Sequence, residues 1–127
     1  VKKWIEDLSI KAPSGEIPAQ TLSGGNQQKV VLAKWLATNP KVFILDSPTV
    51  GIDIASKSNI HSIIRELANR GMGIIIISDE IPEVLTNCNR ILIMVNGEVK
   101  KIIDNVEGVT EEEIFKVVSS QVKSEVV

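Results

Sequence analysis

The chain has 127 residues, which suits a single domain with a modest hydrophobic core. Hydrophobic residues make up 43% of the chain and the formal net charge is −2, which excludes a disordered chain and argues against nucleic acid as a partner. The longest apolar runs, 74–77 and 91–95, are too short to cross a bilayer, and the single cysteine, Cys88, excludes an internal disulfide framework.

The first third of the chain predicts two helices joined by a loop. Apolar residues among charges in residues 4–8 (WIEDL) indicate the end of an amphipathic helix, and 13–18 (PSGEIP) indicate a loop. The second helix follows Ser23 as N-cap and runs through Ala37, and Asn39-Pro40 ends it. Its apolar residues predict that it is largely buried: Val30, Val31, Leu32, Trp35 and Leu36.

The middle of the chain predicts two parallel strands joined by a helix. Residues 42–45 are a continuous apolar run, the pattern of a strand covered on both faces, and 74–77 predict a second buried strand. Between them, apolar residues recur at helical spacing from Ile60 to Ala68, and Gly71 is placed to form the C-cap. This order predicts a right-handed βαβ unit.

The last third predicts a short helix and a hairpin. The helix is expected to begin near 79–80, with Pro82 in its first turn. Residues 91–95 and 98–103 flank Asn96-Gly97, a strong signal for a tight turn between antiparallel strands.

A capping box predicts a final helix. Thr110 and Glu113 have the required spacing, and apolar residues follow them, namely Ile114, Phe115, Val117 and Val118. We expect the tail after Ser119 to fray.

Polar residues follow both predicted strands: Asp46-Ser47 after the first and Ser78-Asp79 after the second. Ligands of open parallel sheets bind beyond the carboxyl ends of the strands, so these four residues would share one edge if the strands are neighbours. Asp46 could hold Mg²⁺ there, usually through water, or it could cap a turn through Ser47-Pro48. We favour the first interpretation, because packing explains poorly why an acid closes a buried strand.

Ser23-Gly24-Gly25 opens a helix, where free N–H groups, a hydroxyl and two glycines could admit an anion such as phosphate. The alternative is an ordinary helix start. The sequence contains no G-x-x-x-x-G-K-[ST] loop, so the chain alone is expected to bind ATP poorly or not at all.

Three further residues favour structural interpretations. His61, the single histidine, falls off the apolar stripe of its predicted helix and is expected to be solvated. Trp4 and Trp35 occupy apolar helical positions and are expected in the core rather than in a base-stacking platform.

Several motifs together resemble a known family. Residues 22–30 (LSGGNQQKV) resemble the signature motif of ABC transporter ATPases, and the Asn-Gln-Gln form is similar to that of monosaccharide importers of the ribose, galactose or xylose type. Residues 42–46 resemble a Walker B strand, and 51–53 (GID) resemble a D-loop. Residues 78–84 (SDEIPEV) resemble the switch region, in the form typical of the second of two tandem ATPase halves.

The resemblance implies an α/β fold with a P-loop NTPase-like, three-layer parallel sheet and a C-terminal β-hairpin. It implies the C-terminal part of one nucleotide-binding domain, without its Walker A and Q-loop portion. Residues 1–38 would hold the remnant of a helical subdomain and the signature helix. Residues 39–127 would hold Walker B, the D-loop, the switch region and the C-terminal hairpin and helix. The chain opens on Val1 rather than Met, which also suggests a piece of a longer protein.

In this family, ATP lies between two nucleotide-binding domains. By resemblance, Ser23-Gly24-Gly25 would bind the γ-phosphate of ATP held by the partner half, with Gln27 as a supporting residue. Asp46 would hold Mg²⁺ through water in this half's own site, and Asp53 would contact the partner across the interface.

Two positions depart from the family pattern. Ser47 stands where the family has the glutamate that polarises the attacking water. The hydroxyl of serine cannot accept a proton at neutral pH unless another base assists it. Asp79 stands where the family has a histidine that contacts the γ-phosphate, and a carboxylate there would repel it. Asp79 could instead be a helix N-cap, which we favour. Both groups needed for hydrolysis at this half's own site are therefore expected to be missing.

The resemblance thus predicts a fragment of the ATP-hydrolysing subunit of a monosaccharide importer, inactive alone, with ATP and Mg²⁺ as cofactors in the full-length protein. Expected partners are a second nucleotide-binding domain, membrane permease subunits and, indirectly, an extracytoplasmic sugar-binding protein. The expected location is cytoplasmic, on the inner face of the membrane. One alternative is a non-catalytic dimerisation module. The other is a DNA-maintenance ABC ATPase, against which the Asn-Gln-Gln form and the mild acidity argue.

Overall fold

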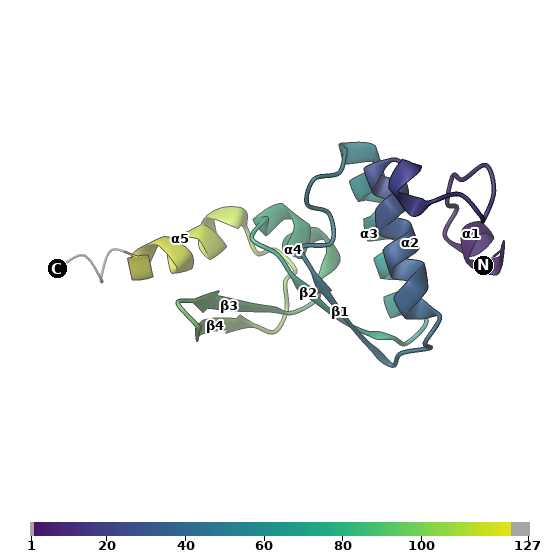
Figure 1. Ribbon diagram of the computed structural model, residues 1–127. Helices are drawn as coiled ribbons and strands as arrows, with labels where there is room; N and C mark the ends of the chain where they lie inside the picture. Colours follow the sequence, from purple (N-terminus) through teal and green to yellow (C-terminus); the bar gives the residue numbers. More distant parts are fainter. Residues whose placement is uncertain (1, 123–127) are drawn as a thin grey trace. The chain divides into compact units, whose positions relative to one another are not determined.

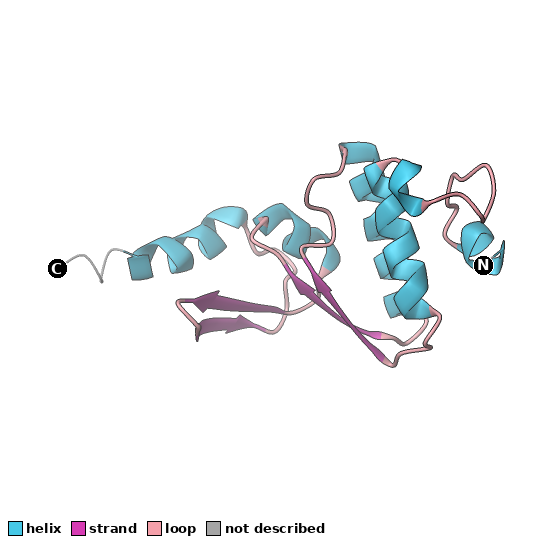
Figure 2. Ribbon diagram, in the orientation of Figure 1, coloured by secondary structure: helices cyan, strands magenta, loops and turns pink. Residues whose placement is uncertain are grey.

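The computed structural model describes residues 2–122, which form two compact units that divide after Ile77. Figure 1 labels the helices and strands in chain order, and Figure 2 colours them by type. The first unit contains α1 (Lys2–Asp7), η1 (Ala19–Thr21), α2 (Gly24–Leu36), β1 (Val42–Asp46), α3 (Ile54–Asn69) and β2 (Gly73–Ile77). The second contains α4 (Ile81–Asn87), β3 (Ile91–Val95), β4 (Glu98–Ile103) and α5 (Glu111–Val122).

The predicted pair of parallel strands is confirmed in the first unit. β1 and β2 run parallel, in a register from Val42 opposite Gly73 to Asp46 opposite Ile77, and α3 connects them. Gly71 follows α3 with a φ of 91°, a conformation that glycine adopts without strain, which agrees with its expected capping role. The two strands therefore end at the same edge of the sheet.

The sheet of the first unit is covered on one face. Phe43 and Leu45 of β1 point into a core that they share with α2 and α3, whereas Val42 and Ile44 are 57% and 61% exposed. The expectation that β1 is covered on both faces is therefore wrong for the described residues. Burial alternates along the strand because α2 and α3 both lie over the same face (Figure 1).

The expected burial of α2 is only partly confirmed. Leu32 and Leu36 are buried, but Val31 is exposed and Trp35 is 52% exposed, so the expectation for these two residues is wrong. The side chain of Trp4 lies outside the described residues. Because α2 is covered on one side, it behaves as an amphipathic helix rather than a fully buried one.

Lys29 of α2 is buried, with 8% of its surface exposed. Its Nζ donates a hydrogen bond of 3.1 Å to the carbonyl oxygen of Ser9, beyond the carboxyl end of α1. Burial, and then the charge of Lys11, lowers the pKa of Lys29. This contact ties the segment after α1 to the middle of α2.

The hairpin and the capping box of the second unit are both confirmed. β3 and β4 are antiparallel, and Asn96 and Gly97 have φ values of 52° and 80°, as a tight turn between such strands requires. At the start of α5, the N–H of Thr110 donates to Glu113 Oε2 at 2.9 Å, and the N–H of Glu113 donates to Thr110 Oγ1 at 3.3 Å.

The final helix is longer than expected. It continues to Val122, so the expected fraying after Ser119 is wrong for residues 120–122, and the residues beyond lie outside the described part. The core of this unit is small and consists of Ile91, Ile93, Val106 and Ile114. None of the helices in residues 2–122 combines the length and hydropathy that a membrane span needs.

Candidate functional site

The N-terminus of α2 presents the first group of candidate residues. Ser23 precedes the helix in the N-cap position, as expected, but its side chain makes no capping hydrogen bond. Ser23 and Gly24 are exposed, whereas Gly25 is buried. The backbone N–H groups of the first turn and the hydroxyl of Ser23 therefore form a short donor-rich surface of the kind that suits an anion.

The two glycines of this stretch have different surroundings. A methyl group on Gly25 would lie 2.4 Å from Ser56 Oγ and 2.5 Å from Ser56 Cβ, in α3. A methyl group on Gly24 would have Ile52 Cγ2 as its nearest neighbour, at 3.5 Å, which is an ordinary contact. The structure thus supplies a packing reason for Gly25, the close approach of α2 and α3, in addition to the ligand approach expected from the sequence.

Replacing Gly25 by alanine should destabilise the protein by about 1–3 kcal/mol, because the added methyl group forces Ser56 and α3 away from α2. Gly24→Ala is the matched control and should leave stability nearly unchanged or slightly raised. Thermal unfolding measures both variants. A second change, Ser56→Gly, should recover part of the loss in Gly25→Ala. Equal stability of the two alanine variants would contradict the close approach.

Gln27 is tied to the loop before α2. Its Nε2 donates to the carbonyl oxygen of Leu22 at 2.7 Å and to that of Gln20 at 3.4 Å. The side chain therefore fixes the loop that carries Ser23, which agrees with a supporting role, although a ligand contact of Gln27 stays a prediction.

Asp46 and Ser47 form the second group, at the end of β1. Asp46 is exposed, and its Oδ1 accepts a hydrogen bond of 3.0 Å from the hydroxyl of Ser47. The N–H of Ser47 donates to the carbonyl oxygen of Ile77 at 2.8 Å and so extends the pairing of β1 with β2. Ser47 has a φ of 50°, a conformation that is uncommon for residues other than glycine and is often found at functional turns.

Asp46 and Ser47 fit Mg²⁺ in part. A carboxylate and a hydroxyl are oxygen ligands of the kind that Mg²⁺ accepts. No group of three or more His, Cys, Asp or Glu residues that could hold a metal occurs within residues 2–122. Phosphate oxygens and water would therefore have to complete the coordination, as is usual where Mg²⁺ accompanies a nucleotide.

Asp53 has a structural role that was not predicted from its sequence context. Its Oδ1 accepts from the N–H of Ser56 at 2.9 Å, and its Oδ2 accepts from the hydroxyl of Ser56 at 2.7 Å, so Asp53 is the N-cap of α3. The hydrogen bonds from Ser56, that from the side chain first, lower the pKa of the exposed Asp53 carboxyl. An aspartate three residues before a serine could have indicated this cap.

Ser78 and Asp79 belong to the second unit. Glu80, rather than Asp79, occupies the N-cap position of α4, and it makes no side-chain capping bond. The N–H of Glu80 instead donates to Ser78 Oγ at 3.1 Å. The interpretation of Asp79 as an N-cap is therefore wrong, and Asp79 is exposed. Its placement beside Asp46 and Ser47 stays a prediction, because those residues belong to the first unit.

His61 was expected to be solvated, and in α3 it is half-buried, so it is only partly exposed to solvent. Cys88 lies at the end of α4, where burial, and then the charge of Glu83, raises the pKa of its thiol. Neither residue belongs to the groups described above.

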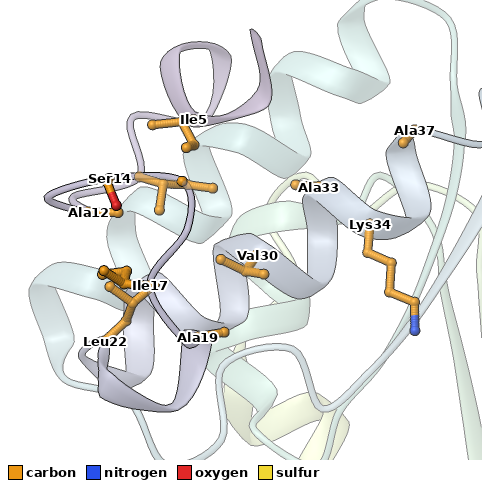
Figure 3. Close-up of a pocket in the computed structure, with 12 residues that line it drawn as sticks. Ile5, Ala12, Ser14, Ile17, Ala19, Leu22, Val30, Ala33, Lys34 and Ala37 are labelled. Atoms are coloured by element: carbon orange, nitrogen blue, oxygen red, sulfur yellow. The ribbon is translucent and has the colours of Figure 1, made fainter. Parts of the chain in front are cut away.

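A mostly apolar pocket of about 410 Å³ lies between α2 and the segment from α1 to η1 (Figure 3). Its lining includes Ile5 and Ile17 from that segment, Leu22 between η1 and α2, and Val30 and Ala33 from α2. Ser23 and Gln27 are not among the lining residues, so the pocket is separate from the donor-rich surface at the N-terminus of α2.

The fold is similar to that of solved ATP-binding cassettes. An ATP-binding cassette of an ABC transporter superposes with a TM-score of 0.75 and 28% identity, over 97% of this chain and 46% of that one. A bacterial ABC transporter cassette solved as a dimer gives a TM-score of 0.72 and 24% identity, over 85% of this chain and 46% of that one. The chain therefore has the α/β fold of the P-loop NTPases, in the form found in ATP-binding cassettes.

Sequence comparisons then give the family. The family model described as "ABC transporter" matches residues 1–50. The ribose import ATP-binding protein RbsA of Geobacillus kaustophilus is 47% identical over 116 residues, which cover 91% of this chain. The galactose/methyl galactoside import ATP-binding protein MglA of Clostridium tetani is also 47% identical over 116 residues. Ribose import ATP-binding protein RbsA 3 of Rhizobium etli is 54% identical over 96 residues, which cover 76% of this chain.

The chain belongs to the ABC transporter ATPase family. It spans 23% of the length of the Geobacillus and Clostridium relatives and 19% of the Rhizobium relative.

Proposed function

We propose that this chain is part of the ATP-hydrolysing subunit of an ABC-type monosaccharide importer, and that it supplies the signature motif to an ATP site shared with a second nucleotide-binding domain. The observation that carries the proposal is the stretch 22–30 (LSGGNQQKV), whose Ser23 and Gly24 are exposed at the N-terminus of α2. The names of the relatives, which are ribose and galactose import ATP-binding proteins, support the sugar assignment.

The N-terminus of α2 suits the terminal phosphate of ATP held by the partner domain. Its N–H groups point out of the helix, the helix dipole favours negative charge there, and the hydroxyl of Ser23 adds one donor. Gly24 is exposed and has no side chain, so a ligand can approach the backbone there closely. Charge stabilisation of this kind is what hydrolysis of the terminal phosphoanhydride bond of ATP requires from its surroundings.

The chain's own Walker B edge supports ATP binding more than ATP hydrolysis. Asp46 would hold Mg²⁺ through water, while Ser47 lacks the carboxylate that would take a proton from the attacking water. Asp79, at the position of the family's switch histidine, places a carboxylate where a hydrogen-bond donor to the phosphate is wanted. We therefore infer that this half binds MgATP, hydrolyses it slowly, and assists faster hydrolysis at the partner's site.

The proposed partners follow from the relatives' role in import. They are a second nucleotide-binding domain, membrane permease subunits on the cytoplasmic face of the membrane and, indirectly, an extracytoplasmic sugar-binding protein. A non-catalytic dimerisation module is the second candidate, and Ser47 and Asp79 favour it. A module of that kind should pair equally well with and without ATP.

Replacing Ser23 by alanine in the full-length protein tests the proposal. The rate of ATP hydrolysis should fall roughly tenfold, because one hydrogen bond to a charged phosphate is lost. Ser62→Ala, at an exposed position of α3, is the matched control and should leave the rate unchanged. Unchanged hydrolysis after Ser23→Ala would overturn the proposal, and so would equal turnover at the site of Asp46 and at the partner's site.

A further inference from the structure

Asn26, in the first turn of α2, connects Ser23 to the segment that follows α1. Its Oδ1 accepts a hydrogen bond of 2.9 Å from the backbone N–H of Lys11. Its Nδ2 donates a hydrogen bond of 2.9 Å to Ser23 Oγ. Lys29, one turn further along α2, holds the same segment through the carbonyl oxygen of Ser9.

The network fixes the orientation of the Asn26 amide. A backbone N–H can only donate, so the amide oxygen has to face Lys11 and the amide NH₂ has to face Ser23. The oxygen of Ser23 is therefore the acceptor in its bond with Asn26, and the hydroxyl proton of Ser23 remains available to a further acceptor. The absence of a capping bond from Ser23 also means that its oxygen does not occupy the first-turn N–H groups of α2.

We propose that Asn26 is a positioning residue, which holds the hydroxyl of Ser23 as a hydrogen-bond donor toward a terminal phosphate oxygen at the N-terminus of α2. The bonds form a chain in one direction, from the N–H of Lys11 through the amide of Asn26 to the hydroxyl of Ser23. Each bond in such a chain polarises the next, so the hydroxyl at its end is a stronger donor than an isolated serine.

This inference rests on the proposed function, because it assigns the acceptor at the end of the chain to ATP. It differs from a direct ligand contact of Asn26, since both polar atoms of its amide already have partners within the first unit. The role of Asn26 is thus expected to depend entirely on Ser23.

A double-mutant cycle in the full-length protein tests that dependence, with kcat and KM for ATP measured separately. Asn26→Ala should lower kcat/KM about threefold to fivefold, as expected for the loss of one neutral hydrogen bond. In the Ser23→Ala background, Asn26→Ala should have no further effect on kcat/KM. Thermal unfolding of the same variants reports the loss of the Lys11 contact, which should remain in the Ser23→Ala background, where the hydrogen bond between Asn26 and Ser23 is already absent.

Asn26→Asp sharpens the test because it keeps the size of the side chain and the acceptor for Lys11. The second oxygen of the carboxylate would turn the hydroxyl of Ser23 inward, so kcat/KM should fall further than with Asn26→Ala. The added charge alone is measured by the same substitution in the Ser23→Ala background, where the loss should be smaller.

The outcomes distinguish a failure of the proposed function from a failure of the positioning role of Asn26. If Ser23→Ala leaves ATP hydrolysis unchanged, the proposed function fails and this inference fails with it. If Ser23→Ala slows hydrolysis but the effect of Asn26→Ala is the same in both backgrounds, the positioning role is overturned and the proposed function stands. A loss that disappears in the Ser23→Ala background supports the positioning role.

Discussion

Replacing Ser47 by glutamate in the full-length protein should raise the rate of ATP hydrolysis at the site that contains Asp46 by about a hundredfold or more, since a positioned general base contributes roughly 10²- to 10⁴-fold. The carboxylate of glutamate can polarise the attacking water at neutral pH, whereas the hydroxyl of serine cannot accept its proton without another base. This result is the one that distinguishes a site lacking a base from a site that cannot bind nucleotide.

The backbone at Ser47 should accept this change. Its hydrogen bond to Ile77 is made by the N–H group, and its φ of 50° costs glutamate about as much as it costs serine. The hydrogen bond of 3.0 Å from the serine hydroxyl to Asp46 would be lost, and two carboxylates would then lie close together. Their repulsion should be smallest when Mg²⁺ is bound.

Ser47→Gln is the matched control, because glutamine has the size of glutamate without the basic carboxylate. The rate of ATP hydrolysis by Ser47→Gln should equal that of the parent protein. Turnover should be measured with the partner's own catalytic glutamate replaced, so that only this site contributes. Adding Asp79→His to Ser47→Glu should raise the rate again. Equal rates for Ser47→Glu and Ser47→Gln would show that the missing base does not limit this site.

Local signals in the sequence predicted much of the fold correctly. The Asn96-Gly97 turn, the capping box of Thr110 and Glu113, and the glycine after α3 each depend on a few neighbouring residues, and the structure confirms all three. The parallel pairing of β1 with β2 followed from the order of strand, helix and strand. These features are encoded locally, so a single sequence is enough to predict them.

Burial was predicted less well because it depends on which other elements are present. An apolar run such as 42–45 indicates that a strand avoids water, but it cannot say which element covers each face. In the described residues, one face of β1 is exposed. Lys29 is a second example: it is buried in α2, and its Nζ reaches the carbonyl oxygen of Ser9, a contact that no local pattern predicts.

The places of two candidate residues in the fold were predicted from the sequence, and their hydrogen bonds were not. The sequence predicted Ser23 before a helix and Asp46 at the end of a strand, and the structure places both there, whereas the N-cap position of Asp53 was not predicted. Asn26 and Ser56 each lie three residues after the candidate residue that they bond, so these two hydrogen bonds are local. The hydrogen bond from the N–H of Lys11 to Asn26 and the close approach of Gly25 to Ser56 depend on the three-dimensional arrangement. Asp79 illustrates the limit of propensity, because an aspartate before a helix is a good N-cap and yet Glu80 occupies that position.

Replacing Asp46 by asparagine should weaken Mg²⁺-dependent ATP binding at this half's own site by roughly 10- to 100-fold, the usual cost of losing a residue that holds a metal through its bound water. Asparagine keeps the size of the side chain and can still accept the hydrogen bond from Ser47, so the end of β1 should keep its conformation. Binding of a fluorescent ATP analogue during a Mg²⁺ titration measures the effect, and Asp7→Asn, at an exposed position of α1, is the control.

The same variant also separates the two roles that we assign to this half. Asp46→Asn should leave binding of the analogue without Mg²⁺ unchanged, because the carboxylate is proposed to act through the metal. Hydrolysis at the partner's site should fall far less than it does after Ser23→Ala, because the signature stretch is intact. If Asp46→Asn and Ser23→Ala lowered both activities to the same extent, the assignment of Asp46 to one ATP site and of Ser23 to the other would be wrong.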